Sequence, residues 1–131
     1  MGVVEQLNAN PLPLAQHLGI EIIAAEPERV VARLTVRPEL CTSGGILHGG
    51  GFMALADTVG AIGARLNLTD GANTTTIESK TNFLGSAAIG TVVSAEATPI
   101  HRGRRSSVWQ TRVTNPAGKL LALVTQTQLV I

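Results

Sequence analysis

The chain has 131 residues, enough for one domain, and carries 10 Lys and Arg against 9 Asp and Glu. Its net charge of +1 gives no case for a nucleic-acid-binding protein, which needs a strongly basic face. Hydrophobic residues make up 44% of the sequence, enough for a packed core, which excludes a disordered chain. Charged residues reach only 15%, so we expect other subunits to cover part of the surface.

Cysteine usage and hydropathy indicate the compartment. Cys41 is the only cysteine, so no internal disulfide can form and a reducing compartment is expected. The N-terminal sequence has neither a basic start nor an apolar run of signal-peptide length. No stretch approaches the roughly 18 consecutive apolar residues of a membrane helix. We therefore expect a cytoplasmic protein with no membrane partner.

The first third of the chain predicts one hairpin after a short helix. Residues 1–12 are expected to be a loose lead-in, and residues 14–18 to form one or two helical turns that stop at Gly19. Residues 20–25 and 30–36 predict two strands joined by a short turn. The second strand has one apolar face, which comprises Val30, Ala32, Leu34 and Val36.

A loop rich in Ser, Thr and Gly leads to a segment that predicts one long helix. Residues 52–68 are rich in Ala and Leu, lack Pro and suffice for four turns. Asp57 and Arg65 are their only charged residues, so the helix is expected to be mostly buried. Gly60 and Gly63 each weaken a helix by up to about 1 kcal/mol relative to Ala, so another element is expected to pack closely against them.

The rest of the chain predicts strands. Four β-rich runs, separated by segments with turn chemistry, comprise residues 74–83, 91–100, 106–114 and 120–130. Successive short turns predict an antiparallel meander. The sequence therefore predicts a single α+β domain over residues 1–131, in which an antiparallel sheet of five to six strands wraps one long helix.

Asp57 is the most informative residue, because a carboxylate within an apolar helix is rarely buried without a reason. It could act in catalysis, mark a solvent edge of the helix, or pair with Arg65. Gly49, Gly50 and Gly51 stand at the helix start, where free N–H groups and the dipole favour negative charge. This turn could be an oxyanion hole for acyl transfer or a plain glycine hinge.

The spacing of Gly49 and Asp57 has a consequence for assembly. They are eight residues apart, so about 12 Å of helix rise separates them. One carbonyl could not easily meet both groups from a single chain. If both act together, a two-fold partner must supply one of them, which predicts an obligate dimer with shared sites.

Other polar residues allow more than one interpretation. His48 could act as a base, although its position beside the helix start favours a structural hydrogen bond. Arg102, Arg104 and Arg105 could clamp phosphates or form a solvated hairpin tip. Three scattered His and one Cys predict no metal site.

The stretch LHGGGFMALADTVGA, residues 47–61, resembles the signature of hotdog-fold thioesterases. It is similar to the phenylacetate-pathway (PaaI-like) and 4-hydroxybenzoyl-CoA thioesterases, with His-Gly-Gly and an acidic residue nine positions after the His. Weaker similarity extends over about residues 14–131. The resemblance implies a hotdog fold, hydrolysis of an acyl- or aryl-CoA without a metal or redox cofactor, and a homodimer that forms a dimer of dimers.

The resemblance also implies roles for individual residues. Asp57 would be the nucleophile or general base, and Gly49 would supply the oxyanion-hole N–H. Thr76 would hold the water or the aspartate. Thr42 stands where the family often has an Asn or Gln that orients the thioester, so this chain departs from the pattern there. The remaining expected substrate or CoA contacts are Gly50, Thr75, Arg102, Arg104 and Arg105.

Two other functions stay open at this point. A non-catalytic acyl-CoA sensor would keep the arginines and the glycine turn but would have no use for Asp57. A hotdog-type hydratase or dehydratase would show a catalytic His with Asp, or a Pro-Gly before the helix, and the sequence lacks that pattern. The pattern leaves open the acyl group, the choice between dimer and tetramer, and the choice between nucleophile and general base.

Overall fold

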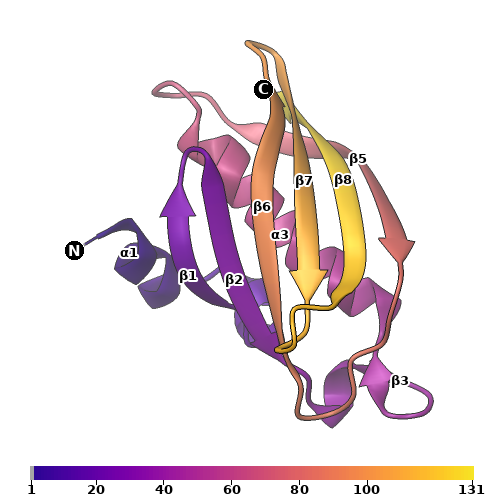
Figure 1. Ribbon diagram of the computed structural model, residues 1–131. Coiled ribbons are helices and arrows are strands. Elements are labelled where there is room, and N and C mark those ends of the chain that lie inside the picture. Colours follow the sequence, from indigo (N-terminus) through magenta and orange to yellow (C-terminus); the bar gives the residue numbers. More distant parts are fainter. Residues whose placement is uncertain (1) are drawn as a thin grey trace.

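A long helix, α3 (Gly49–Leu66), lies against a curved six-stranded antiparallel sheet in the computed structural model, which describes residues 2–131 (Figure 1). The strands are β1 (Glu21–Glu26), β2 (Arg29–Thr35), β5 (Thr74–Phe83), β6 (Val92–Arg102), β7 (Ser106–Thr114) and β8 (Leu120–Val130). They lie in the order β1-β2-β6-β7-β8-β5, and each neighbouring pair is antiparallel. The predicted α+β architecture, one long helix wrapped by a sheet of five to six strands, is confirmed.

The smaller elements precede β1 and α3 in the chain. Helices α1 (Val3–Ala9) and α2 (Pro13–Leu18) precede β1, and α2 stops at Gly19, which has the left-handed conformation expected of a helix stop (φ 76°). A 3-10 turn, η1 (Pro38–Leu40), leads into two paired short strands before α3, β3 (Cys41–Thr42) and β4 (Ile46–Leu47). The helix begins three residues earlier and ends two residues earlier than residues 52–68 predict. No helix among residues 2–131 is long and apolar enough to cross a membrane.

The core forms where the apolar face of each strand meets α3. On β2 the predicted alternation holds, because Val30, Ala32 and Leu34 are all buried. On α3, Leu55 and Val59 are fully buried, and burial of each such side chain contributes about 1.5–3 kcal/mol. The sheet therefore fixes the rotation of α3 about its axis.

Two helical glycines allow the close approach of helix and sheet that the sequence predicts. A Cβ atom added to Gly60 would lie 2.2 Å from Gln126 Oε1 on β8. One added to Gly63 would lie 2.6 Å from the Trp109 ring on β7. Both distances are shorter than van der Waals contact, so the sheet could not lie this close to an alanine at either position.

The expectation of a loose lead-in at residues 1–12 is wrong for the residues described. Residues 3–9 form α1, beside β1 (Figure 1). The Asn8 side chain accepts a hydrogen bond from the Ile22 N–H and donates one to the Ile22 carbonyl, both at 2.9 Å. Val4 and Leu7 also pack against the core. Tertiary contacts thus hold a helix too short to be stable alone.

The predicted meander holds for β6, β7 and β8 but is wrong for β5. This strand pairs with β8 at the edge of the sheet rather than with β6, the next strand in the chain. The segment 84–91 is a crossover that joins the two. Its backbone bonds to Leu121 at one end and to Val36 at the other. Because these hydrogen bonds satisfy its polar groups, the segment can cross the end of the sheet without regular structure.

Candidate active site

Asp57 is half-buried on α3, and two sheet residues hold its carboxylate. Its Oδ1 accepts a hydrogen bond from Thr76 Oγ1 of β5 at 2.7 Å. It accepts a second from Gln126 Nε2 of β8 at 3.0 Å. The other oxygen, Oδ2, accepts no hydrogen bond from residues 2–131. One oxygen is therefore fixed and the other stays free, which suits a nucleophile or a general base.

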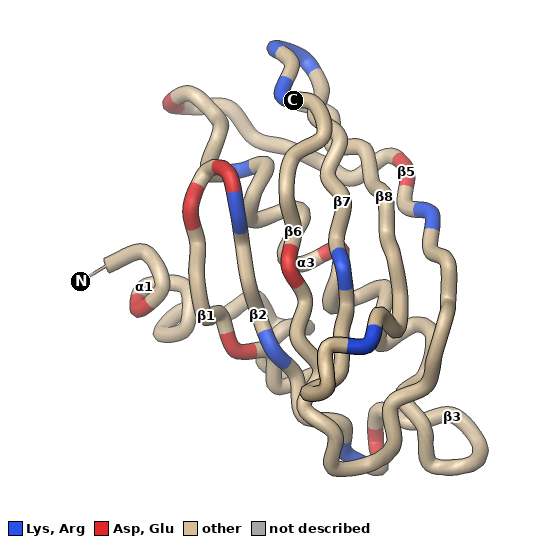
Figure 2. Tube along the Cα trace, in the orientation of Figure 1, with Lys and Arg blue, Asp and Glu red and all other residues tan. Residues whose placement is uncertain are grey.

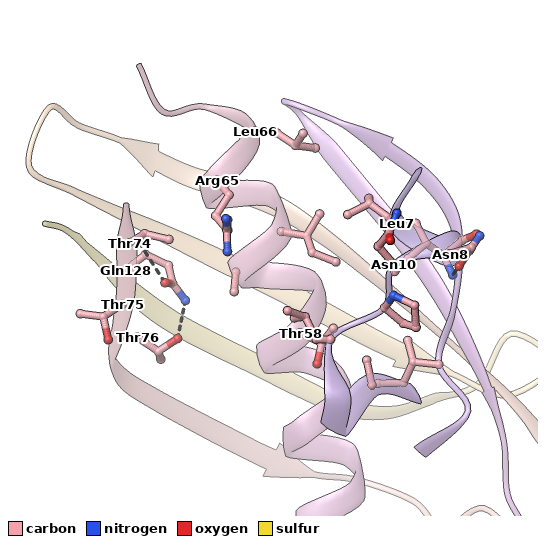
Figure 3. A pocket seen from close by; sticks show the side chains of 17 residues that line it. Leu7, Asn8, Asn10, Thr58, Arg65, Leu66, Thr74, Thr75, Thr76 and Gln128 are labelled. Atoms are coloured by element: carbon pink, nitrogen blue, oxygen red, sulfur yellow. Dashed lines mark hydrogen bonds between the residues drawn. The ribbon is translucent and has the colours of Figure 1, made fainter. Parts of the chain in front are cut away.

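A further glutamine sets the direction of the Thr76 hydroxyl. Gln128 Nε2 donates to Thr76 Oγ1 at 2.6 Å. A hydroxyl has one proton to donate, so Thr76 accepts from Gln128 and directs its own proton to Asp57. Thr74 Oγ1 lies within hydrogen-bond distance of two acceptors, Gln128 Oε1 at 3.2 Å and the Leu129 carbonyl at 3.1 Å, and can donate its proton to either. The dashed lines between Thr74, Gln128 and Thr76 in Figure 3 mark two of these bonds.

Neither glutamine was among the predicted site residues. Gln126 and Gln128 are 0% and 1% exposed. Together with the apolar Val124, they occupy successive inward-facing positions of β8. A buried amide costs free energy unless it is hydrogen-bonded, so two amides on an apolar face indicate a polar site. Two polar residues at inward positions of a predicted strand were therefore the signal that the sequence offered. It acquires meaning only once β8 is known to face Asp57.

Gly49 has the free N–H that the sequence predicts. The first four N–H groups of a helix have no partner among the helical residues themselves. In α3, His48 accepts hydrogen bonds from three of these four groups. Its Nδ1 accepts from Gly50 N at 2.7 Å, and its carbonyl accepts from Gly51 N at 2.8 Å and Phe52 N at 3.3 Å. The Gly49 N–H has no acceptor among the described residues. It lies at the positive end of the helix dipole, where a developing oxyanion is stabilised.

His48 caps the helix. Its Nδ1 carries a lone pair toward the Gly50 N–H and so has no proton in this arrangement. This geometry favours the structural hydrogen bond over a role as a base. It also occupies the Gly50 N–H, so that group is not available to a substrate.

One chain holds Asp57 and Gly49 at opposite ends of β5. Asp57 bonds Thr76 near the start of the strand. Gly49 lies against Phe83 at its end, where an added Cβ would be 3.3 Å from the Phe83 ring. The structure thus keeps apart the two groups that a thioester carbonyl would need together. The alternative pairing of Asp57 with Arg65 does not occur.

A pocket of about 620 Å³ adjoins the carboxylate (Figure 3). It is bounded by Thr74, Thr75 and Thr76 of β5 on one side of α3, and by the N-terminal segment from Leu7 to Ala15 on the other. Ala61, Ile62 and Arg65 of α3 form its floor. The size is typical of a ligand site. Thr76 belongs both to the pocket wall and to the Asp57 network, so a ligand there would lie beside a residue that holds the carboxylate.

The remaining predicted residues lie farther from Asp57. Thr42 is exposed on β3, near the N-terminus of α3. The three arginines lie at the tip of the β6–β7 hairpin, which is blue in Figure 2. Arg102 donates to Asn67 Oδ1 at 3.4 Å, so the tip adjoins the C-terminal end of α3, and Arg104 and Arg105 are exposed there. No group of three or more His, Cys, Asp or Glu within residues 2–131 could hold a metal ion.

Comparison with known proteins identifies the family. Residues 44–122 match the family model of the thioesterase superfamily. A 1,4-dihydroxy-2-naphthoyl-CoA hydrolase of Listeria monocytogenes is 33% identical over 110 residues, which cover 84% of this chain and 89% of that protein. A crystal structure of a thioesterase from Haemophilus influenzae, 33% identical, has a TM-score of 0.92 and covers 100% of this chain and 92% of its own. The Escherichia coli PaaI protein, 24% identical, shares the fold with a TM-score of 0.88, over 98% and 91% of the two chains.

The chain therefore belongs to the thioesterase superfamily and has its hotdog fold. It is a thioester hydrolase. The resemblance of residues 47–61 to the signature of hotdog-fold thioesterases is therefore confirmed as a family relationship.

Proposed function

We propose that the protein hydrolyses an acyl- or aryl-CoA thioester to the free carboxylic acid and CoA, with Asp57 as its catalytic carboxylate. The observation that carries this proposal is the asymmetric binding of the carboxylate. Thr76 and Gln126 hold Oδ1, and Oδ2 stays free to react. The Listeria relative named as a CoA hydrolase supports CoA as the thiol.

Two routes use this arrangement, and both consume one water. In the first, Asp57 Oδ2 attacks the thioester carbon, the C–S bond breaks, CoA leaves as the thiol after protonation, and water cleaves the resulting anhydride. In the second, Oδ2 takes a proton from a water that attacks the carbon directly, and that proton passes to the CoA sulfur as the C–S bond breaks. In either route negative charge develops on the carbonyl oxygen. The free Gly49 N–H is suited to stabilise it.

The separation of Asp57 from Gly49 supports a dimer with shared sites. β5 is an open edge of the sheet, and its side chains at Thr76 and Phe83 both face α3. A two-fold axis near Lys80, midway between them, would pair β5 with its copy in antiparallel register. Phe83 of the partner subunit would then lie beside Thr76. The partner subunit's Gly49 would reach Asp57, and the same would hold in the second site. Two such dimers would form the expected tetramer.

The remaining contacts follow from the size and charge of CoA. The mostly apolar pocket suits an aryl or aliphatic acyl group, and Thr75 lines it. Gly50, whose N–H bonds His48, would contact the substrate only through its Cα. Arg102, Arg104 and Arg105 offer donors for the CoA phosphates. Thr42 would orient the carbonyl with its hydroxyl. The hydrolysis itself calls for no cofactor.

The test is CoA release, followed with a thiol reagent, from phenylacetyl-CoA, hydroxybenzoyl-CoA and medium- to long-chain acyl-CoAs. Asp57→Asn keeps the shape of the side chain, and we expect it to lower kcat by about 10²–10⁴-fold. Asp70→Asn, in the exposed turn after α3, is the matched control and should match wild type. Equal release by Asp57→Asn would move catalysis to another residue. No release by the wild type would favour a binding module.

A further inference from the structure

The Asp57 carboxylate holds the Gln126 amide in one orientation. An ionised carboxylate can only accept hydrogen bonds, so the amide directs its nitrogen at Asp57, and Nε2 lies 3.0 Å from Oδ1. The amide oxygen, Oε1, then faces away from Asp57 and has no hydrogen-bond partner among residues 2–131. A buried acceptor without a partner costs free energy, and this side chain is fully buried. The amide thus keeps its bond to Asp57 although its oxygen is left unpaired.

Gly60 provides the space in which this amide lies. Asp57 and Gly60 are three residues apart on α3, so they share a helix face, with roughly 4.5 Å of rise between them. A Cβ atom added to Gly60 would lie 2.2 Å from Oε1, 2.4 Å from Cδ and 2.8 Å from Nε2 of Gln126. The whole amide group therefore packs against the bare backbone at position 60. Any side chain there would displace the amide and separate Nε2 from Asp57.

The second interior glycine of α3 differs from Gly60 in what it faces. A Cβ atom added to Gly63 would have its nearest neighbours in the Trp109 ring, at 2.6 Å. The Nε1 of this ring donates to Ser107 Oγ and takes no part in the hydrogen bonds of Asp57. Gly63 is therefore a matched control, a helical glycine in equally close contact with the sheet but not with the amide.

We propose that Gly60 is a positioning residue of the active site, which acts through Gln126. Because position 60 has no side chain, the amide can hold Oδ1 of Asp57, and Oδ2 is left as the oxygen that reacts. Gly60 itself touches neither the carboxylate nor the reacting atoms. The proposal rests on the proposed function, in which Asp57 is the catalytic carboxylate, and adds a residue on which the orientation of that carboxylate depends.

The first test compares Gly60→Ala with Gly63→Ala by steady-state release of CoA from the thioester that wild type hydrolyses fastest. We expect Gly60→Ala to lower kcat by about tenfold with KM nearly unchanged, because Asp57 loses a hydrogen bond that orients its charged form. Gly63→Ala should keep most of the wild-type kcat. A kcat of Gly60→Ala equal to that of wild type, or an equal loss in both variants, would overturn the proposal.

A double-mutant cycle shows whether Gly60 acts through the amide. Gln126→Met keeps a long, flexible side chain without the donor and should itself lower kcat by about tenfold. If the amide carries the effect of Gly60, adding Gly60→Ala to Gln126→Met should lower kcat by no more than about a further twofold. Multiplication of the two single losses would place the effect of Gly60 elsewhere in α3 and would refute its role.

Crystal structures of the two alanine variants separate this proposal from the proposed function, because they require no turnover. In Gly60→Ala, Nε2 of Gln126 should lie beyond hydrogen-bond distance of Asp57, whereas in Gly63→Ala it should stay near 3.0 Å. Displacement in Gly60→Ala alone would uphold the role of Gly60 in holding Asp57 even if wild type hydrolysed no thioester. An unbroken bond in Gly60→Ala would overturn that role even in an active thioesterase.

Discussion

A proline at position 49 would remove the backbone N–H of Gly49, the proposed oxyanion donor, without removing any side chain. Proline lacks the N–H and fits the first position of a helix, and His48 before it already has the extended conformation that proline requires (φ −60°, ψ 141°). We expect Gly49→Pro to lower kcat by about 10²–10³-fold, as loss of an oxyanion-hole donor does elsewhere.

The matched control is Gly49→Ala. It keeps the N–H and adds only a methyl, 3.3 Å from the Phe83 ring, so it should retain most of the activity. The two variants would be compared by steady-state CoA release. Similar losses in both would assign the effect to steric bulk, and the Gly49 N–H would have no part in the reaction.

Thr76 and Thr81 lie on the same strand but differ in their hydrogen bonding. Thr76 Oγ1 donates to Asp57, whereas Thr81 Oγ1 is buried with no partner. Thr76→Val should lower kcat by about tenfold, because it removes a charged hydrogen bond and leaves the Gln128 amide unpaired. Thr81→Val should keep the activity and raise the free energy of unfolding by about 1 kcal/mol, as measured with urea. Full activity in Thr76→Val would show that Asp57 needs no such support.

Some of the candidate site residues can be recognised from the local sequence, and others only from the folded structure. Asp57 and Gly49 were predictable, because a charge within an apolar helix and glycines at its start are local features. Gln126 and Gln128 were not, because their partners, Asp57 and Thr76, lie 69 and 52 positions away from them in the chain. Pairing across such distances depends on the topology of the sheet.

At the scale of elements, α3 depends on its two interior glycines. Gly63→Ala would favour the isolated helix by up to about 1 kcal/mol. The new methyl would, however, meet the Trp109 ring at 2.6 Å, and overpacking of a core costs about 1–3 kcal/mol. We expect a net loss of stability, measured by urea unfolding. Trp109→Leu in the same chain should recover part of that loss, and simple additivity of the two changes would contradict a direct contact.

Element type was more predictable than element pairing. The bounds of β5, β7 and β8 follow from alternation and turn residues, and the structure reproduces them. The position of β5 beside β8 and the helix α1 were missed. Both depend on tertiary contacts, namely the crossover at residues 84–91 and the Asn8 bonds to Ile22. Local propensity carries little information about either.

At the scale of the whole molecule, the proposed function requires a single chain to hold two half-sites. Each half-site lies at one end of the open β5 edge, and each lacks what the other contains. Antiparallel pairing of this edge would complete both sites at once, and it would also cover the exposed Ile77 and Phe83. The low charge fraction of the chain agrees with a surface of this kind.

Subunit mixing tests this account most directly. Homodimers of Asp57→Asn and of Gly49→Pro, each inactive alone, would be dissociated, mixed in equal amounts and reassembled, and CoA release would be measured. A shared site predicts about one quarter of wild-type activity, because half the dimers are mixed and each of these has one intact site. Activity no higher than that of the separate variants would contradict the account, because each chain would then carry its whole site.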